Sequence, residues 1–487
     1  MRLSALISEG ERVGPADLDP DITGLASDSR AVRPGDLFAA LPGARVDGAA
    51  FVEEAIARGA GAILTSPGRA LDVPSIQAEN PRRELARIAA AFYRDQPRHL
   101  LAVTGTNGKT SVAGFVRQIF AALGEPAASL GTLGCLCEGV AAPPPVGPSL
   151  TTPDPIALQR MLAELVAAGV QHAALEASSH GLAQSRLDGL RLAAAAYTNL
   201  TRDHLDYHGS FEAYRDAKAR LFTELLPDGS TAVLNVDQPE IAALVVVCRD
   251  RGLHVLDYGR GASAIRLLSV RTDADGQGLS LEIEGRRHEL RLGLVGAFQA
   301  DNVMAALGLA LAAGAPLEQV LGILPSLRGA PGRMQRVGTH ASGAPVFVDY
   351  AHTPDALDNV LRALRPHTGN RLVVVFGCGG DRDPGKRPQM GRIAALLADR
   401  VIVTDDNPRS EPPAAIRAAV LTAAPGATEV GDRREAIRRA VATLATGDVL
   451  VVAGKGHESG QIVGSEVLPF DDALEVRAAL EALGAAA

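Results

Sequence analysis

Residues 100–110 have the sequence LLAVTGTNGKT, and the architecture of the chain can be worked out from them. The apolar run 100–103 predicts a short buried strand, and a glycine-bearing turn follows at 105–108. Lys109 and Thr110 then open a helix whose apolar residues keep helical spacing until Gly124. A strand, a glycine turn and a helix in this order cradle nucleotide phosphates. Backbone N–H groups approach the oxygens, Lys109 neutralises charge and Thr110 can bind Mg²⁺. The match to the phosphate-loop motif is incomplete, because Val103 stands where the first glycine belongs.

Length and composition limit the class of protein. A chain of 487 residues predicts about three domains, and 47% hydrophobic with 21% charged residues predicts a globular fold. The net charge of −8 argues against nucleic-acid and anionic-membrane partners. The four cysteines have neither disulfide-framework nor zinc spacing, and the N-terminus has no signal-peptide pattern. Since no apolar run is long enough to span a membrane, we expect a cytoplasmic protein with no membrane partner.

The N-terminal residues 1–96 predict a small α/β domain. Strands are expected at 37–41 and 61–64, with a helix at 49–58 between them. A polar cluster at 27–30 is typical of a turn.

Residues 97–331 predict the phosphate-loop domain. A strand at 173–177 carries Glu176 near its end, where an acid faces the ligand crevice of an open α/β sheet. Residues 203–208 hold two histidines and two aspartates, a pattern that fits a solvated loop and a metal or substrate site equally well. The expected helix 211–226 carries Lys218, and helix pattern alone predicts a solvated lysine there. Other expected features of this part are a Pro-rich mobile loop at 141–145, a helix ending at 168, a strand at 194–197, strands at 279–283 and 287–294, a helix ending at 313 and a linker at 326–336.

Residues 332–487 alternate strands and helices. Strands are predicted at 345–348, 371–376, 401–404 and 449–453, and each ends in a polar or glycine-bearing loop. Four such loops at the same end of parallel strands would converge on one ligand crevice in a doubly wound sheet.

Taken together, seven ordered motifs resemble those of the Mur ligase family over essentially the whole chain. The motifs are TGTNGKT, EASSHGL, TNLTRDHLDYH, DYAHTPDAL, GCGGDRDPGKRP, DNPR and AGKGHE. The resemblance implies an α/β fold of three domains: a small UDP-sugar-binding domain (1–96), a central ATP-binding domain with a parallel sheet (97–331) and a C-terminal Rossmann-like amino-acid-binding domain (332–487).

The resemblance also implies an activity: ATP-dependent addition of meso-diaminopimelate to UDP-N-acetylmuramoyl-L-alanyl-D-glutamate in peptidoglycan precursor synthesis. ATP converts the carboxylate to an acyl phosphate, and the amine then displaces phosphate. Cations must reduce the repulsion between the substrate carboxylate and the triphosphate of ATP, and Lys109 and Mg²⁺ are expected to do so. By resemblance, Glu176 and His204 hold a second Mg²⁺, besides the one on Thr110. Lys218 is carbamylated and helps to hold this second ion, so the resemblance implies a functional lysine where helix pattern alone predicts a solvated one. We expect a monomer whose partners are the three substrates.

The site residues that the resemblance implies fall into five groups. The catalytic group is Lys109, Lys218, His204 and Glu176, and the metal group is Thr110, Glu176, His204 and Lys218 as its carbamate. The ATP group is Gly105, Thr106, Asn107, Gly108, Lys109, Thr110, Ser111, Asn302, Arg333, Asp349 and His352. The UDP-muramoyl dipeptide group is Ser29, Thr151, Thr152, Ser178, Gln184 and Arg186. The diaminopimelate group is Arg387, Asp406, Asn407, Pro408, Arg409, Gly454 and Glu458.

The diaminopimelate group makes physical sense. A guanidinium takes the distal carboxylate through two parallel hydrogen bonds, and Glu458 takes the distal ammonium. Lysine-adding relatives lack the arginine of the DNPR motif, so Arg409 favours diaminopimelate over lysine.

Three other interpretations of the chain fit its motifs less well. Folylpolyglutamate synthase shares the ATP domain but lacks a UDP-binding first domain and the DNPR loop. A regulatory GTPase needs an N-K-x-D motif, which does not occur in this chain. A purely structural role leaves the His-Asp and DNPR clusters without a purpose.

Overall fold

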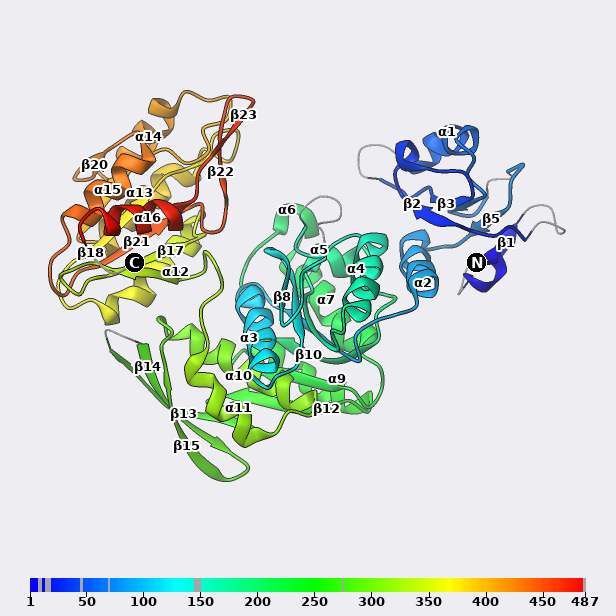
Figure 1. Cartoon of the computed structure of the whole chain (residues 1–487), viewed down its shortest axis with the longest axis horizontal. Coiled ribbons are helices and arrows are strands. Elements are labelled where there is room, and N and C mark those ends of the chain that lie inside the picture. Colours follow the sequence, from blue (N-terminus) through cyan, green and yellow to red (C-terminus); the bar gives the residue numbers. More distant parts are fainter. Residues whose placement is uncertain are drawn as a thin grey trace. The chain divides into compact units, whose positions relative to one another are not determined.

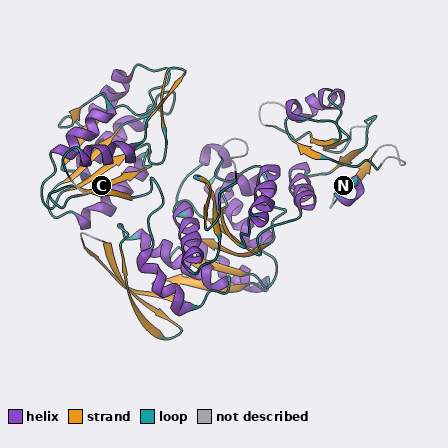
Figure 2. Ribbon diagram, in the orientation of Figure 1, coloured by secondary structure: helices purple, strands orange, loops and turns teal. Residues whose placement is uncertain are grey.

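The structure is a computed structural model, and it describes residues 1–7, 11–13, 19–43, 47–68, 71–143, 150–273 and 276–484. The chain forms two compact units, Met1–Ile265 with Met304–Val320, and Arg266–Val303 with Leu321–Ala487. The fold is α/β, as expected. Figure 1 labels the elements of both units, and Figure 2 separates helices from strands.

The N-terminal part of the first unit is a small sheet with a core on each face. The strands are ordered β1-β5-β4-β3-β2, and all their pairs are parallel except β1 with β5. Leu37 and Ala39 of β3 belong to one core and Phe38 and Ala40 to the other. The elements are η1 (Leu3–Ala5), β1 (Glu11–Val13), β2 (Gly24–Ala26), η2 (Ser29–Ala31), β3 (Asp36–Ala39), η3 (Gly48–Phe51), α1 (Val52–Ala57), β4 (Ala62–Thr65), β5 (Ser75–Gln77) and α2 (Pro81–Tyr93).

The rest of the first unit is built on a larger sheet. Seven strands of a ten-stranded sheet follow the order β12-β11-β10-β6-β9-β7-β8, and among these seven only the pairing of β7 with β8 is antiparallel. The elements are β6 (His99–Thr104), α3 (Lys109–Ala122), β7 (Ala127–Gly131), β8 (Gly134–Glu138), α4 (Pro155–Ala167), β9 (His172–Glu176), α5 (Ser179–Ala183), β10 (Leu192–Tyr197), α6 (Leu205–His208), α7 (Phe211–Arg220), η4 (Leu221–Leu225), β11 (Thr231–Asn235), α8 (Pro239–Ala242), α9 (Leu244–Asp250) and β12 (His254–Gly259). The predicted strand–turn–helix at 100–124 is therefore confirmed at the centre of this sheet.

The second unit contains a doubly wound sheet. Its strands are ordered β16-β17-β21-β18-β19-β20, and only β16 runs antiparallel to its neighbour. Alternate residues of β18 enter two cores: Phe376 packs in the core that holds Leu357, and Val375 packs in the core that holds Val476. Helices therefore cover both faces of the sheet.

The remaining elements, from β12 to the C-terminus, follow in chain order. They are β13 (Ile265–Asp273), β14 (Gly276–Ile283), β15 (Arg286–Leu292), α10 (Phe298–Ala312), α11 (Leu317–Ile323), η5 (Leu324–Ser326), β16 (Gln335–Thr339), β17 (Pro345–Asp349), α12 (Pro354–Leu364), η6 (Arg365–His367), β18 (Leu372–Phe376), α13 (Lys386–Leu397), β19 (Arg400–Val403), α14 (Pro413–Leu421), β20 (Thr428–Glu429), α15 (Arg433–Ala442), β21 (Val449–Ala453), β22 (Gly460–Val463), β23 (Glu466–Pro469) and α16 (Asp472–Glu481).

Three sequence predictions differ from the structure in their bounds. The helix expected at 211–226 is α-helical only to Arg220, and a π-helical turn follows it, with Leu221 and Phe222 fully buried. The helix expected at 49–58 begins as the 3₁₀ turn η3. The linker expected at 326–336 ends two residues early, because β16 begins at Gln335. Residues 144–149, which include part of the predicted Pro-rich loop, lie outside the described residues.

Candidate active site

The phosphate loop is shaped by glycine backbone at two points. Gly105 has φ +146°, and a Cβ there would meet the Thr198 hydroxyl at 2.0 Å. Gly108 has φ +87° and caps the N-terminus of α3. Because both conformations are left-handed, glycine suits both positions. Ser111 lies in the first turn of α3 and is buried.

Side chains from the loop after β10 hold the phosphate loop in place. Asn199 Oδ1 accepts a hydrogen bond from the Asn107 N–H at 2.9 Å, and Thr198 Oγ1 donates to the Asn107 carbonyl at 2.6 Å. Thr106 Oγ1 lies 3.0 Å from the Tyr214 hydroxyl of α7. The loop conformation is therefore fixed by protein contacts.

Two lysines share one carbonyl in this loop. Lys109 Nζ donates to the carbonyls of Gly105 and Thr106 at 2.8 Å each, and Lys218 Nζ donates to the Gly105 carbonyl at 2.7 Å. Lys218 is 1% exposed, so the solvated position that helix pattern predicted is wrong. Burial, with the charge of Lys109 beside it, holds the pKa of Lys218 well below its usual range. A lysine of this kind carries a reactive neutral amine more readily than a surface lysine does.

Glu176, the last residue of β9, bonds both to Thr110 beside the phosphate loop and to Thr132, which follows β7. Its Oε1 accepts hydrogen bonds from the Thr110 hydroxyl and the Thr132 N–H, both at 2.9 Å. Its Oε2 accepts from the Thr132 hydroxyl at 3.2 Å, and that hydroxyl lies 3.1 Å from Thr151 Oγ1. Hydroxyl and carboxylate oxygens are the hard donors that suit Mg²⁺.

His204 lies apart from this oxygen cluster. It has φ +50°, an uncommon conformation for a non-glycine residue, and its Nε2 is 3.5 Å from Asp203 Oδ2. Its ring is 4.8 Å from that of His180 and 6.3 Å from that of Tyr214. About half of its side chain is exposed. Within the described ranges, no group of three or more His, Cys, Asp or Glu residues is arranged to hold a metal ion.

The predicted dipeptide residues form one connected network, apart from Ser29. Thr152 Oγ1 donates to the Glu176 carbonyl at 2.7 Å and lies 2.9 Å from Ser178 Oγ. Arg186 donates to the Thr152 carbonyl and to Gln184 Oε1, and Gln184 donates to the Tyr207 hydroxyl. Ser29 lies in the N-terminal sheet region, where its hydroxyl donates to Glu54 at 2.9 Å.

Three of the predicted nucleotide residues of the second unit flank its first two strands: Arg333 precedes β16, Asp349 ends β17 and His352 follows it. The buried Asp349 accepts hydrogen bonds from the N–H groups of Met334 and Ala351, and burial raises its pKa. His352 Nδ1 lies 2.8 Å from the Tyr350 carbonyl, and burial lowers its pKa. The Arg333 guanidinium stacks 4.6 Å above the Tyr350 ring. Asn302, on α10, donates to Gln299 at 3.0 Å.

The loops after the parallel strands of the second unit converge, as predicted. Asn407, after β19, donates to Glu458 Oε2, after β21, at 2.9 Å. Arg409, after β19, donates to the Gly380 carbonyl, after β18, at 2.9 Å. Gly454 has φ +118°, and a Cβ there would meet Asp406 at 2.6 Å.

The DNPR loop is further fixed by neighbouring backbone. Arg409 has φ +52°, and its N–H donates to the Ile462 carbonyl of β22. The Pro408 carbonyl lies against Gly380, where a Cβ would meet it at 1.9 Å. Arg387 is buried and donates to Glu411 at 2.8 Å, while its Nε is buried without a hydrogen-bond partner among the described residues.

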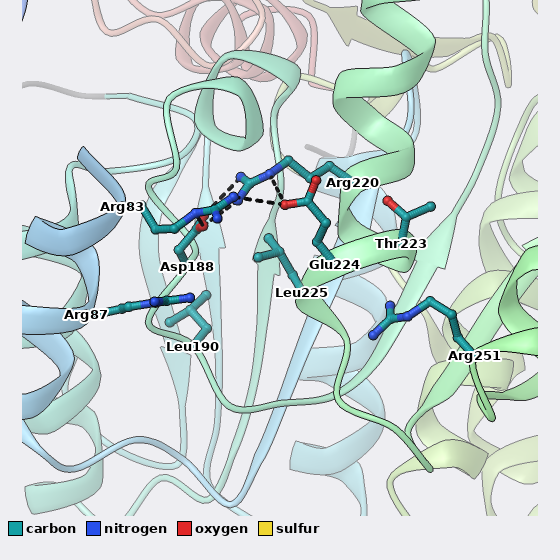
Figure 3. Close-up of a pocket in the computed structure, with 9 residues that line it drawn as sticks. All are labelled: Arg83, Arg87, Asp188, Leu190, Arg220, Thr223, Glu224, Leu225 and Arg251. Carbon is teal, nitrogen blue, oxygen red and sulfur yellow. Dashed lines mark hydrogen bonds and ion pairs between the residues drawn. The ribbon is translucent and has the colours of Figure 1, made fainter. Parts of the chain in front are cut away.

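A separate cavity of about 490 Å³ in the first unit is lined by arginines, and Figure 3 shows it. Asp188 and Glu224 pair with the guanidinium groups of Arg83, from α2, and Arg220, from α7. Arg251 is occupied by the carbonyls of Phe222 and Leu226. These ion pairs connect α2 with the larger sheet region of the first unit. None of the predicted site residues lines the cavity.

Comparison with known proteins identifies the family. Three family models match: "Mur ligase family, catalytic domain" over residues 21–102, "Mur ligase middle domain" over 103–310 and "Mur ligase, glutamate ligase domain" over 332–456. The chain belongs to the Mur ligase family. The three models follow one another along the chain.

Individual Mur ligases resemble the chain over nearly its full length. The UDP-N-acetylmuramoyl-L-alanyl-D-glutamate–2,6-diaminopimelate ligase of Caulobacter vibrioides is 56% identical, covering 97% of this chain and 98% of the relative. The ligase of the same name from Mesorhizobium japonicum is 53% identical, covering 96% of each chain. A solved structure of a ligase of this name is 34% identical, with a TM-score of 0.73, covering 97% and 98%.

Sequence reasoning missed several residues of the site. Thr132 and Asn199 stand at strand ends, a position that marks ligand crevices, and that signal could have found them. Lys455 lies inside the AGKGHE motif but was given no role. Tyr214 and the β22–β23 hairpin carried no sequence signal, because their importance comes only from contacts that the fold creates.

The described part of the chain contains no helix long and apolar enough to cross a membrane. Its four cysteines are free thiols, in agreement with the absence of disulfide spacing in the sequence.

Proposed function

We propose that this chain is the ATP-dependent ligase that adds meso-diaminopimelate to UDP-N-acetylmuramoyl-L-alanyl-D-glutamate through an acyl phosphate. The observation that carries the proposal is the 56% identity, over 97% of the chain, to a ligase of that name. The converged loops that bring together Asn407, Arg409 and Glu458 support it, because a distal carboxylate and ammonium need both a guanidinium and a carboxylate.

The nucleotide binds at the phosphate loop in this proposal. The N–H groups of the loop and the start of α3 hold the phosphates, and Lys109 neutralises the charge that moves during phosphoryl transfer. Asn302, Arg333, Asp349 and His352 complete the ATP site. Thr151, Thr152, Ser178, Gln184, Arg186 and Ser29 bind the UDP-muramoyl dipeptide, and its carboxylate is the acceptor of the phosphoryl group.

The metal in this proposal is Mg²⁺ at two sites: Thr110 holds one ion, and Glu176, His204 and a carbamylated Lys218 hold the second. When bound, it supplies positive charge that screens the two reacting anions. Carbamylation requires a neutral amine and carbon dioxide, so the depressed pKa of Lys218 favours it. The amine nitrogen bonds to the carbon of carbon dioxide and releases a proton, and the resulting anionic carbamate attracts the Lys109 ammonium.

The amine of diaminopimelate then attacks the acyl phosphate and displaces phosphate. The amino acid is held by Arg387, Asp406, Asn407, Pro408, Arg409, Gly454 and Glu458. We propose the domain division 1–96, 97–331 and 332–487 for the three substrates, a cytoplasmic location and a monomeric enzyme.

Phosphate release tests this function. The enzyme is mixed with ATP, Mg²⁺ and UDP-muramoyl dipeptide, and meso-diaminopimelate is compared with L-lysine. We expect diaminopimelate to support turnover at least about 100-fold better, because lysine lacks the distal carboxylate and leaves the Arg409 guanidinium without its partner. Equal use of lysine, or no phosphate release with diaminopimelate, would contradict the proposal.

A further inference from the structure

The chain uses arginine for nearly all of its cations, with 44 arginines and only four lysines. The four lysines are Lys109, Lys218, Lys386 and Lys455. Each is partly or fully buried, whereas many arginines lie on the surface. Where arginine is the default cation, a buried lysine marks a position that needs a compact ammonium. Two of the four belong to the phosphate loop, and Lys455 has no role in the function proposed above.

We infer that Lys455 is a positioning residue, which holds Asn407 and Glu458 so that Glu458 presents its carboxylate to the distal ammonium of the amino-acid substrate. This inference rests on the proposed function and deepens it, because it names what builds the ammonium end of the amino-acid site.

Lys455 is fully buried among oxygen atoms. Its Nζ donates to Asn407 Oδ1 at 2.9 Å and to Glu458 Oε2 at 3.3 Å, and it lies 3.7 Å from Asp406 Oδ1. It has no exposed surface, whereas the side chain of Glu458 is 34% exposed. The lysine therefore lies beneath the carboxylate and cannot itself meet a ligand from solvent.

Lys455 also helps to fix the orientation of the Asn407 side-chain amide. Asn407 Oδ1 accepts from Lys455 and, at 2.9 Å, from the Ile462 N–H of β22. Its amide nitrogen must therefore face Glu458, to which it donates at 2.9 Å. Without the ammonium, the amide loses its stronger anchor and Glu458 loses two partners in one step.

Glu458 is the exposed member of a group of otherwise buried charges. Arg433 and Asp472 form a fully buried ion pair, and Arg433 also donates to the Ala453 carbonyl at the end of β21. The carboxylates of Asp406 and Asp472 are almost fully buried, whereas that of Glu458 reaches solvent. Of the three, Glu458 is therefore the carboxylate that a substrate ammonium can meet.

The test compares two amino acids that differ only at that ammonium. The first is meso-diaminopimelate, and the second is 2-aminopimelate, in which hydrogen replaces the distal amino group. In the unmodified enzyme we expect the KM for 2-aminopimelate to be about tenfold or more above that for diaminopimelate. In Lys455→Met this ratio falls to near one, mainly because the KM for diaminopimelate rises, while the KM for ATP stays the same.

Two further variants make the result specific. Glu458→Gln, at a partly exposed position, should fold and lose the same discrimination; the double variant should lose no more than either single one. Lys386→Met, another lysine of the second unit, which donates to the His352 carbonyl, should keep the ratio of the two KM values. Circular dichroism checks that each variant is folded, and Glu458→Gln carries the test if Lys455→Met is not.

The inference is overturned if Lys455→Met keeps the ratio, if Glu458→Gln keeps it, or if the two substitutions have additive effects. Failure of the proposed function looks different, because the unmodified enzyme would then not use diaminopimelate at all.

Discussion

Lys218 and Lys455 are both lysines with almost no exposed surface, yet their surroundings are opposite. Lys218 donates to a backbone carbonyl, lies 4.7 Å from the centre of the Tyr214 ring and has the charge of a second lysine, Lys109, nearby. Lys455 has an amide oxygen and two carboxylates around its Nζ. The first site opposes a positive charge and the second compensates one. Burial alone therefore does not decide what a lysine does, because its partners set whether the charged form is tolerated.

The difference separates two chemical uses of one side chain. An uncompensated amine such as Lys218 is suited to covalent modification, since the neutral form reacts. A compensated ammonium such as Lys455 is suited to holding other groups in place. The predictions below test each side of this comparison, beginning with the largest expected effect.

Lys109→Ala removes the cation that lies beside both the phosphate loop and Lys218. We expect turnover to fall by about 10³-fold, since a preorganised charge at the transferring group is lost. Stability should be almost unchanged, and single-turnover phosphate release with a urea unfolding curve measures both. Near-normal turnover in the folded variant would remove Lys109 from the mechanism.

Lys218→Ala removes the proposed carbamate. Turnover should fall by about 10²-fold, and acetate should restore part of it, because the missing group is an anion. Depleting carbon dioxide should weaken the unmodified enzyme and leave the variant unaffected. An active variant that ignores both acetate and carbon dioxide would show that Lys218 is not modified.

The local parts of this site could be predicted from sequence. The strand, turn and helix around Gly105 and Gly108 follow from neighbouring residues, since backbone conformation there is set by glycine and by apolar spacing. The same holds for the four polar loops of the second unit, because parallel strands place their carboxyl ends at one edge of the sheet.

The surroundings of the two lysines could not be predicted in this way. Lys218 meets Gly105 across 113 positions of sequence, and Lys455 meets Asn407 across 48. Helix pattern therefore placed Lys218 in solvent, and the AGKGHE motif alone gave no partner for Lys455. Contacts at such separations depend on sheet order, which periodicity does not supply.

Arg409→Ala tests the guanidinium that is proposed to bind the distal carboxylate, beside the distal ammonium that Glu458 is proposed to bind. We expect the KM for diaminopimelate to rise by about 30-fold, or about 2 kcal/mol, the low end for a charge pair because Arg409 is only partly buried. The KM for ATP should hardly move. Arg409→Lys is the matched control and should recover only part of the loss, since an ammonium cannot make two parallel bonds. An unchanged KM for diaminopimelate, or efficient use of lysine, would rule out this role.

Stability gives the smallest effect and the most direct comparison of the two lysines. In carbon dioxide-free buffer, Lys218→Met should raise the free energy of unfolding, because it removes a cation that burial disfavours. The folded pKa of Lys218 lies below its unfolded value, so its cost is fully present at low pH and disappears as pH rises to about 10.4. The gain from Lys218→Met should shrink over the same range. Lys455→Met should instead lower the free energy of unfolding by about 1–3 kcal/mol, since it leaves Asp406, Glu458 and Asn407 without their donor. Urea unfolding between pH 6 and pH 9 measures both variants. A shift of the same sign in the two variants would mean that burial, and not the partners, determines what each lysine contributes.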